Sequence, residues 1–293
     1  METIGFVGLG VMGRPMARNL AQAGYKVIVY DKSAEAVREA VQQGAVAGSS
    51  VREIAGSVTR LITMLPDSPD VRAVILEQGG AAETLAKGAT VVDMSTISPH
   101  VTREIAEALA QRGITFFDAP VSGGAKGAIE GKLSIMVGGP QSGFEGILPV
   151  LRVLGTTITW MGESGAGQCA KMCNQMVAAM NIQAVAEALA LGRAEGIDLA
   201  RLHRVLKGGA ANSWILENLG PLMLEKDTRP NFRIDLQVKD LKIVIDSAFR
   251  RNVPVPGTML CSSLYLETRA HGEGSLGNQS MFRAYDRMAN QEE

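Results

Sequence analysis

The chain has 293 residues and a formal net charge of −1, and 46% of its residues are hydrophobic and 20% charged. A single hydrophobic core usually stops growing at about 250–300 residues, so this length favours two domains, and the composition excludes an intrinsically disordered chain. Proteins that bind nucleic acid or a membrane surface usually carry a basic patch or tail; because we find neither, we expect no nucleic-acid partner and no membrane partner.

The opening segment METIGFVGLG runs directly into a predicted strand and lacks the regions of a secretory signal peptide. The three cysteines, Cys169, Cys173 and Cys261, are an odd number and provide no disulfide framework. We therefore expect a reducing compartment and a cytoplasmic protein. Cys169 and Cys173 have no nearby His or Cys to complete a metal site, so we expect them to pack in a core and predict no metal.

A strand, a glycine turn and a helix follow one another at the start of the chain. TIGFV at 3–7 is a short β-branched run, and GLGVMG at 8–13 opens the helix. In this context the pattern predicts a dinucleotide site: Gly8 permits a tight turn, Gly10 lets the backbone approach a pyrophosphate, and Gly13 allows close packing of helix on strand. The alternative is a glycine turn without a ligand. The cofactor-binding residues predicted in this turn are Gly8, Leu9, Gly10, Val11, Met12 and Gly13.

The next predicted strand, 26–31, ends in Asp31. An acid about 20 residues beyond the last glycine hydrogen-bonds the adenosine ribose diol and repels a 2′-phosphate. We therefore predict NAD (NADH) as the cofactor and consider NADP less favoured, although Lys32 and Arg14 leave room for some tolerance of NADP.

Further strands are expected where short apolar runs recur between helical stretches, at 61–66, 89–95, 114–118, 133–139 and 157–162. Runs that are apolar throughout suit a sheet buried on both faces, so we predict a doubly wound α/β domain of the Rossmann type. Ligands of such sheets lie beyond the carboxyl ends of the strands. The residues that this rule places beside the cofactor are Leu65, Pro66, Ser95, Thr96 and the segment after Asp118.

The second half of the chain has helical patterns only. Residues 165–195 form one long proline-free pattern, which charged and amide side chains interrupt too often for a membrane span. We expect an all-α C-terminal domain that begins with this long linking helix, and we divide the chain into residues 1–162 and 163–293. The remaining helices are predicted at 198–208, 212–225, 237–250 and 256–270.

Lys171 and Asn174 are three residues apart on the long helix and therefore lie on the same face, which Ala178 and Asn181 continue. A substrate cleft between a nucleotide domain and a helical domain needs such a polar stripe. A solvated face of an amphipathic helix is an equally good explanation of this stretch. The neighbouring residues expected to face packing are Met172, Cys173, Met176 and Met180.

Four segments stand out along the chain: GFVGLGVMGRPMARNL at 5–20, DAPVSGG at 118–124, GESGAGQCAKMCNQ at 162–175 and KDL at 239–241. In order and spacing they resemble the β-hydroxyacid dehydrogenase family, which includes 3-hydroxyisobutyrate dehydrogenase, and the resemblance covers nearly the whole chain. Within that family, the segments 62–71 and 232–241 look most similar to the tartronate semialdehyde reductases.

The resemblance implies roles for the matching residues. Lys171 falls on the family's catalytic lysine, which would give a proton to the carbonyl oxygen as hydride arrives and act as general base in reverse. Asn174 would hydrogen-bond the same substrate. Ser122, Gly123 and Gly124 would bind the substrate carboxylate, and without the resemblance this segment would be taken for an ordinary loop.

Two further residues, Thr96 and Lys239, fall on family positions that contact the cofactor. Lys239 comes from the second domain, so its contact would help to close the domains around NAD. Without the resemblance, Lys239 would be taken for a surface lysine beside an aspartate. We assign no role to Phe232 or Asp240.

The expected activity is hydride transfer between NAD(H) and a small 3-hydroxy or 3-oxo acid, with reduction of tartronate semialdehyde to glycerate favoured. A 3-hydroxyisobutyrate dehydrogenase, a glyoxylate or succinic semialdehyde reductase, and a non-catalytic NAD-sensing module are the alternatives. Trp214 either lines the substrate pocket or, the favoured case, packs in a core. Apolar helix positions also predict a homo-oligomer, a dimer or tetramer, with contacts among Leu216, Leu219, Leu222, Met223 and Leu224.

Overall fold

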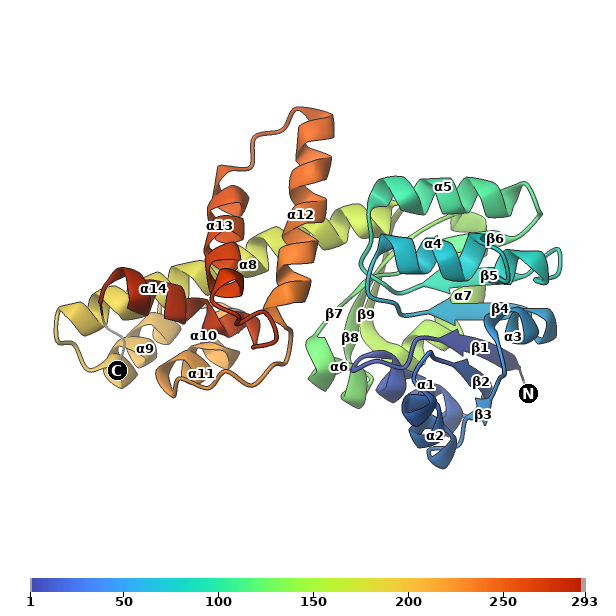
Figure 1. Ribbon diagram of the computed structural model, residues 1–293, viewed down its shortest axis with the longest axis horizontal. Coiled ribbons are helices and arrows are strands. Elements are labelled where there is room, and N and C mark those ends of the chain that lie inside the picture. The colour runs from blue at the N-terminus through green and yellow to red at the C-terminus, as the bar shows by residue number, and fades with distance from the viewer. Residues whose placement is uncertain (1, 291–293) are drawn as a thin grey trace. The chain divides into compact units, whose positions relative to one another are not determined.

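A computed structural model describes residues 2–290 (Figure 1). The chain divides into two compact units, Met1–Lys171 and Met172–Glu293. The boundary falls inside helix α8, Ala166–Ala194, whose 29 residues span about 44 Å. The division at residue 162 that the sequence suggested remains a prediction.

The first unit is built on a nine-stranded sheet in the order β3-β2-β1-β4-β5-β6-β8-β7, with β9 paired to β8. The six strands β3 to β6 of this order are parallel, which is the Rossmann arrangement, and β8 runs antiparallel to β6 and β7. The predicted fold class is therefore confirmed. The strands are β1 Thr3–Val7, β2 Lys26–Tyr30, β3 Val46–Ala47, β4 Arg60–Thr63, β5 Thr90–Asp93, β6 Thr115–Asp118, β7 Val121–Ser122, β8 Leu133–Gly138 and β9 Gly155–Gly162.

Helices cover both faces of this sheet. Helices α1, α2, α6 and α7 share one buried core and α3, α4 and α5 share another. Neighbouring strand residues point to opposite cores, as Phe116 and Phe117 do, which explains why the strand sequences are apolar throughout. The helices are α1 Gly13–Gln22, α2 Ala34–Gln42, α3 Val51–Ser57, α4 Ser68–Leu76, α5 Pro99–Ala110, α6 Gly124–Glu130 and α7 Gln141–Leu154, with a 3₁₀ turn η1 at Ala81–Glu83.

The second unit is helical, as predicted. Among its described residues, 172–290, the structure has no β-strand and a single isolated bridge, between Arg233 and Gly277. The helix predicted at 212–225 is two short helices, because Pro221 cannot continue the first and instead lies in the first turn of the second. Besides α8, the elements are α9 Leu199–Gly208, α10 Trp214–Asn218, α11 Gly220–Leu224, α12 Ile234–Arg251, α13 Pro256–Ala270, η2 Asn278–Met281 and α14 Phe282–Met288.

Three expectations about packing are wrong. Trp214 is 61% exposed, so it does not pack in a core. Cys173 is exposed as well, although Cys169 is half-buried. Leu216 and Met223, expected at a subunit contact, instead lie in the second unit's own core and are 1% and 2% exposed. Periodicity marks an apolar face but does not say what covers it. Within residues 2–290, no helix combines the length and apolar character that a membrane span requires.

Candidate active site

The carboxyl ends of the central strands lie side by side. Val7 of β1 pairs with Thr63 of β4, Thr63 with Asp93 of β5, and Asp93 with Asp118 of β6. The backbone ladder continues one step further, because the Ala119 N–H donates to the Asp93 carbonyl at 2.7 Å. The segments that follow these four strands therefore start at one edge of the sheet, where ligands of Rossmann domains bind.

The glycine turn after β1 has the shape that a pyrophosphate needs. At Gly8, φ is +100° and a Cβ atom would lie 2.2 Å from the Met64 carbonyl oxygen, and at Gly13 a Cβ would lie 1.9 Å from the Gly8 oxygen. Gly10 has open space around its own Cβ position. Met12 precedes α1 without a side-chain cap. The Arg14 N–H already donates to the Gly10 carbonyl oxygen at 3.1 Å and Pro15 has no N–H, so within the first turn of α1 the Gly13 N–H is the group offered to an anion. The turn fits a dinucleotide.

Asp31 connects the first two strand ends. Its Oδ2 accepts a hydrogen bond from the Leu9 N–H at 2.6 Å, and its Oδ1 accepts one from the Ser33 N–H at 2.8 Å. The carboxylate therefore supports the glycine turn from the end of β2. Each carboxylate oxygen has a second acceptor position, which leaves capacity for a ribose diol.

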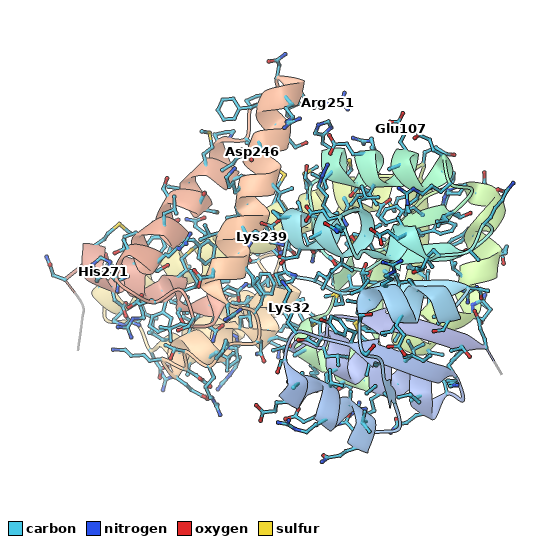
Figure 2. All side chains as sticks on the ribbon, turned by 45° about the vertical axis from the view of Figure 1, so that its right-hand side comes forward. Lys32, Glu107, Lys239, Asp246, Arg251 and His271 are labelled. Carbon is cyan, nitrogen blue, oxygen red and sulfur yellow. The ribbon has the colours of Figure 1, made fainter. Side chains whose placement is uncertain are left out.

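The two basic residues that could favour NADP differ in their surroundings. Lys32 is exposed, directly after Asp31 (Figure 2). Arg14, at the start of α1, forms an ion pair with Glu39 of α2, so part of its charge is already compensated.

A buried polar chain joins the loops that follow β4 and β5. Asp93 Oδ1 accepts from the Thr63 hydroxyl at 2.8 Å and from the Ser95 hydroxyl at 2.6 Å. The Ser95 oxygen in turn accepts from the Leu65 N–H at 2.8 Å. These bonds fix the two loops to each other. The cofactor residues predicted on the loops are Leu65, Pro66 and Thr96.

The segment predicted to bind a carboxylate projects beyond the sheet edge. Strands β6 and β7 both pair with β8, one after the other along its length. Ser122 of β7 is four residues beyond Asp118 of β6, which corresponds to about 13 Å at ~3.3 Å per residue. Ser122 is half-buried. Gly123 and Gly124 have φ of +129° and +60°, and Gly124 has open space at its Cβ position. Larger side chains would strain this turn.

Asp118 holds the start of α8. Its Oδ1 accepts from the Gly165 N–H at 2.7 Å and its Oδ2 from the Gln168 N–H at 2.9 Å. The surroundings are tight: a Cβ on Gly138 would lie 2.5 Å from Asp118 Oδ1, and one on Gly167 would lie 2.4 Å from the Met136 oxygen. The glycines of the GESGAG segment therefore let the helix start touch the sheet.

Burial raises the pKa of Asp118 to about 6, because the carboxylate loses its water. The N–H groups of Gly165 and Gln168 act in the opposite direction and lower the pKa, and the negative charge of Asp93 adds a smaller increase. The raised value shows that desolvation outweighs the two hydrogen bonds.

Lys171 lies in the buried face of α8. Its side chain is 6% exposed, so the solvated-face explanation fails for this residue. Gln168 and Gln175, three residues before it and four after it, are also buried at 1% and 6%. Asn174 is half-buried and lies beside this line of buried polar residues. Lysine is rarely buried this deeply unless its charge is paired or removed.

In the second unit, Asp240 of α12 joins two elements. Its Oδ2 accepts from the Gln175 Nε2 of α8 at 2.6 Å, and its Oδ1 forms an ion pair with the Lys239 Nζ at 2.9 Å. The Lys239 side chain is 17% exposed, which is less than a surface lysine shows. Lys239 shares α12 with Asp246 and Arg251 (Figure 2).

Sequence reasoning did not single out Asp93 or Gln168, and it named Asp240 without assigning it a role. An acid that ends an apolar strand was visible at Asp93 and Asp118, and a glutamine one turn before a lysine was visible at Gln168, but neither pattern is specific by itself. Among the described residues, 2–290, no group of three or more His, Cys, Asp and Glu side chains is placed to hold a metal ion.

Two family models match the chain. The NAD-binding domain of 6-phosphogluconate dehydrogenase matches residues 3–162, and the NAD-binding domain of NADP-dependent 3-hydroxyisobutyrate dehydrogenase matches residues 165–285. Both therefore describe domains of NAD(P)-dependent enzymes, and together they leave few residues unmatched.

Relatives with assigned activities match along their whole length. The 2-hydroxy-3-oxopropionate reductase of Escherichia coli (strain K12) is 40% identical over 287 residues, which cover 98% of each chain. The 3-hydroxyisobutyrate dehydrogenase of Pseudomonas aeruginosa is 38% identical over 281 residues, 93% of this chain and 94% of that protein. The solved structure of Mycobacterium tuberculosis 3-hydroxyisobutyrate dehydrogenase with L-serine matches with a TM-score of 0.89 at 32% identity, covering 97% of this chain and 98% of that one. The chain is thus an oxidoreductase of the β-hydroxyacid dehydrogenase family.

Proposed function

We propose that the protein transfers hydride between NAD(H) and a small 3-hydroxy or 3-oxo acid, and that its substrate is tartronate semialdehyde (2-hydroxy-3-oxopropionate), which it reduces to glycerate. The observation that carries the proposal is the attachment of α8, with its buried Lys171, to the sheet edge that bears the dinucleotide turn. A non-catalytic NAD sensor has no use for a lysine in that place.

In the proposed reaction, the bound nicotinamide supplies the hydride. The Lys171 ammonium donates the proton to the carbonyl oxygen, so that the aldehyde becomes an alcohol, and the neutral amine takes the proton back in the reverse direction. Asn174, one helical turn further along α8, hydrogen-bonds the substrate and holds it in line. The Ser122 hydroxyl and the N–H groups of Gly123 and Gly124 bind the carboxylate.

The choice of substrate rests on the relatives. The 2-hydroxy-3-oxopropionate reductase is 40% identical to this chain and a 3-hydroxyisobutyrate dehydrogenase is 38% identical, so the identities alone separate the two weakly. The substrates differ beside the reacting carbon, where a hydroxyl needs a polar partner and a methyl needs an apolar pocket. A glyoxylate or succinic semialdehyde reductase is the third candidate.

We further propose NAD over NADP. Asp31 stands at the end of β2, where its charge opposes a 2′-phosphate, and the Arg14 charge is compensated by Glu39. The cofactor contacts in this proposal are Gly8, Leu9, Gly10, Val11, Met12, Gly13, Asp31, Leu65, Pro66, Thr96 and Lys239. Three free cysteines support the proposal of a cytoplasmic protein, because a reducing compartment keeps thiols unpaired.

The experiment that tests this function is the initial rate of NADH oxidation with tartronate semialdehyde, methylmalonate semialdehyde, glyoxylate and succinic semialdehyde at equal concentrations. We expect the highest kcat/KM with the first substrate, and a lower kcat/KM when NADPH replaces NADH. A higher kcat/KM with methylmalonate semialdehyde would assign the protein to the hydroxyisobutyrate branch. Binding of NADH without turnover of any of the four would contradict the catalytic proposal.

A further inference from the structure

The side chain of Gln168 binds the backbone on both sides of Thr96. Its Nε2 donates to the Ser95 carbonyl oxygen at 2.8 Å, and its Oε1 accepts from the Ile97 N–H at 3.1 Å. The residue is 1% exposed. A primary amide is the neutral side-chain group that donates and accepts in one plane, so it matches this pair of backbone groups.

The main chain of the same residue is attached to a different strand. The Gln168 N–H donates to Asp118 Oδ2 at the end of β6, while Asp118 Oδ1 accepts from the Gly165 N–H. The first turn of α8 is therefore held at two places, by β6 through Asp118 and by the loop after β5 through Gln168. The turn cannot slide closer to the sheet, because Gly167 already lies against the Met136 carbonyl.

Lys171 follows Gln168 by three residues, so the two side chains lie on the same face of α8, one turn apart. We propose that Gln168 is a positioning residue that sets the distance between Lys171 and the Thr96 loop. The inference rests on the proposed function, in which Lys171 donates the proton and Thr96 contacts the cofactor.

Without the Gln168 amide, the buried Ser95 carbonyl and Ile97 N–H would lose this hydrogen-bond partner. A buried backbone group without a hydrogen bond costs free energy, so the backbone would move to find a new partner. The Thr96 loop would then shift relative to the first turn of α8. A displacement of about 1 Å between a proton donor and its target costs on the order of 10²-fold in rate.

The first test is Gln168→Met, which keeps the length of the side chain and removes the amide. We expect kcat to fall on the order of 10²-fold while the Kd for NADH, measured by fluorescence, changes far less, because the glycine turn and Asp31 are untouched. The matched control is Gln183→Met on the same helix, whose Nε2 bonds Tyr285 at 2.7 Å and Glu187 at 2.8 Å. The control should retain the wild-type kcat. A Gln168→Met variant with wild-type kcat would overturn the proposal.

The second test is Gln168→Glu, which keeps the shape of the side chain. Its ability to donate a hydrogen bond to the Ser95 carbonyl then depends on pH. The carboxylate cannot donate to Ser95, whereas the protonated acid can, and burial raises the pKa of such a group, so kcat relative to wild type should recover from about pH 8 to about pH 6. The titratable side chains on the surrounding elements are Asp93 of β5, Arg103 of α5, Asp118 of β6 and Lys171 of α8. Wild type carries all four, so the ratio removes the titration that the two proteins share. A ratio that does not change with pH would overturn the proposal.

Amide hydrogen exchange separates this inference from the proposed function. The Ile97 N–H should lose protection in Gln168→Met and keep it in Gln183→Met, whether or not any substrate is turned over. Lost protection together with an inactive wild type would refute the proposed function and leave the contact standing. Lost protection with unchanged kcat in an active enzyme would refute the positioning role.

Discussion

The surroundings of Lys171 decide between the two explanations of the polar stripe on α8, a substrate cleft or a solvated helix face. With 6% of its surface exposed, its ammonium is removed from bulk water, and the first turn of its helix is attached to the ends of β5 and β6. An ammonium in a site that excludes water interacts more strongly with a nearby carbonyl oxygen than a solvated one does. The burial therefore supports a chemical role rather than a solubilising one.

We expect Lys171→Met to lower kcat by about 10²–10⁴-fold, the range for loss of a general acid, with NADH still bound. Lys171→Arg should recover little activity, because a guanidinium keeps its proton. Steady-state kinetics and fluorescence titration with NADH measure the two effects. The matched control is Lys207→Met at the exposed end of α9, which should behave as wild type. Wild-type turnover by Lys171→Met would refute the proton-transfer role.

The ionisation of Asp118 should make the free energy of unfolding depend on pH. Its native pKa of about 6 is above the ordinary 3.8 of an unfolded aspartate. Between these values the native state holds a proton that the unfolded state has released, so this group makes the free energy of unfolding fall as pH rises from about 4 to about 6. Above about pH 7 the contribution is constant, because Asp118 is then ionised in both states.

We therefore expect wild type to lose stability relative to Asp118→Asn across that range, by at most on the order of 3 kcal/mol. Urea denaturation of both proteins at about pH 4, 5, 6 and 7 measures the difference. The comparison removes the titration of all other groups. Parallel pH profiles of the two proteins would show that Asp118 ionises normally.

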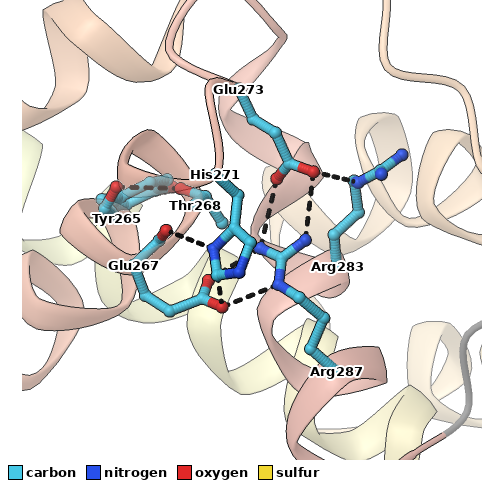
Figure 3. Close-up of polar contacts among 7 residues, drawn as sticks. All are labelled: Tyr265, Glu267, Thr268, His271, Glu273, Arg283 and Arg287. Atoms are coloured by element: carbon cyan, nitrogen blue, oxygen red, sulfur yellow. Dashed lines mark hydrogen bonds and ion pairs between the residues drawn. The ribbon is translucent and has the colours of Figure 1, made fainter.

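At the scale of elements, two arginines attach α14 to α13 and to the segment that follows α13 (Figure 3). Arg287 of α14 donates to Glu267 from Nε and Nη2, both at 2.7 Å, and to Glu273 from Nη1 at 3.0 Å and from Nη2 at 3.2 Å. Arg283 adds a bond to Glu273 at 2.6 Å. The hydrogen bonds from Arg287 hold the pKa of Glu267 below its usual value. The Arg287 side chain is 14% exposed and forms bidentate pairs with two carboxylates. These pairs fix α14 in place.

We expect Arg287→Met to lower the free energy of unfolding by about 2–4 kcal/mol, because Glu273 would stay buried without this partner. Thermal and urea denaturation measure the loss. The control is Arg229→Met: Arg229 also pairs with an acid, Asp227, but is 87% exposed, so its loss should change stability little. Equal effects of the two substitutions would mean that the cluster in Figure 3 adds nothing beyond a surface ion pair.

At the scale of the whole molecule, the second unit leaves large apolar side chains on its surface. Phe249 of α12 is 70% exposed, and Leu260 and Leu266 of α13 are 53% and 48% exposed. The residues that the sequence suggested for subunit contacts are used in the unit's own core instead. Exposed apolar groups of this size often mark an interface. They support the prediction of a homo-oligomer, but through other residues than those that the sequence suggested.

We expect light scattering at micromolar concentration to give a dimer or tetramer of the 31.0 kDa chain, and Phe249→Ser to shift the mass toward the monomer. Val205→Ser on α9, which is 71% exposed, tests whether any exposed apolar residue has the same effect. A monomeric wild type would contradict the prediction.

The sequence alone determined the features that depend on neighbouring residues. The glycine turn, the apolar strands and the helical periodicities are local patterns, and they predicted the parallel sheet and the helical second unit. The family was predicted separately, from the resemblance of four segments to a known family. Strand β7 was beyond such reasoning, because two residues have no periodicity and become a strand only by pairing with β8.

Only the tertiary structure decided which polar groups meet. Asp118 and Gly165 are 47 residues apart in the chain, and Gln168 is 73 residues from Ser95. Burial is decided in the same way: the helical pattern around Lys171 and around Leu216 predicts a face but not what covers it. These contacts form only when the sheet brings the ends of distant strands together, which is why the attachment of α8 was not visible in the sequence.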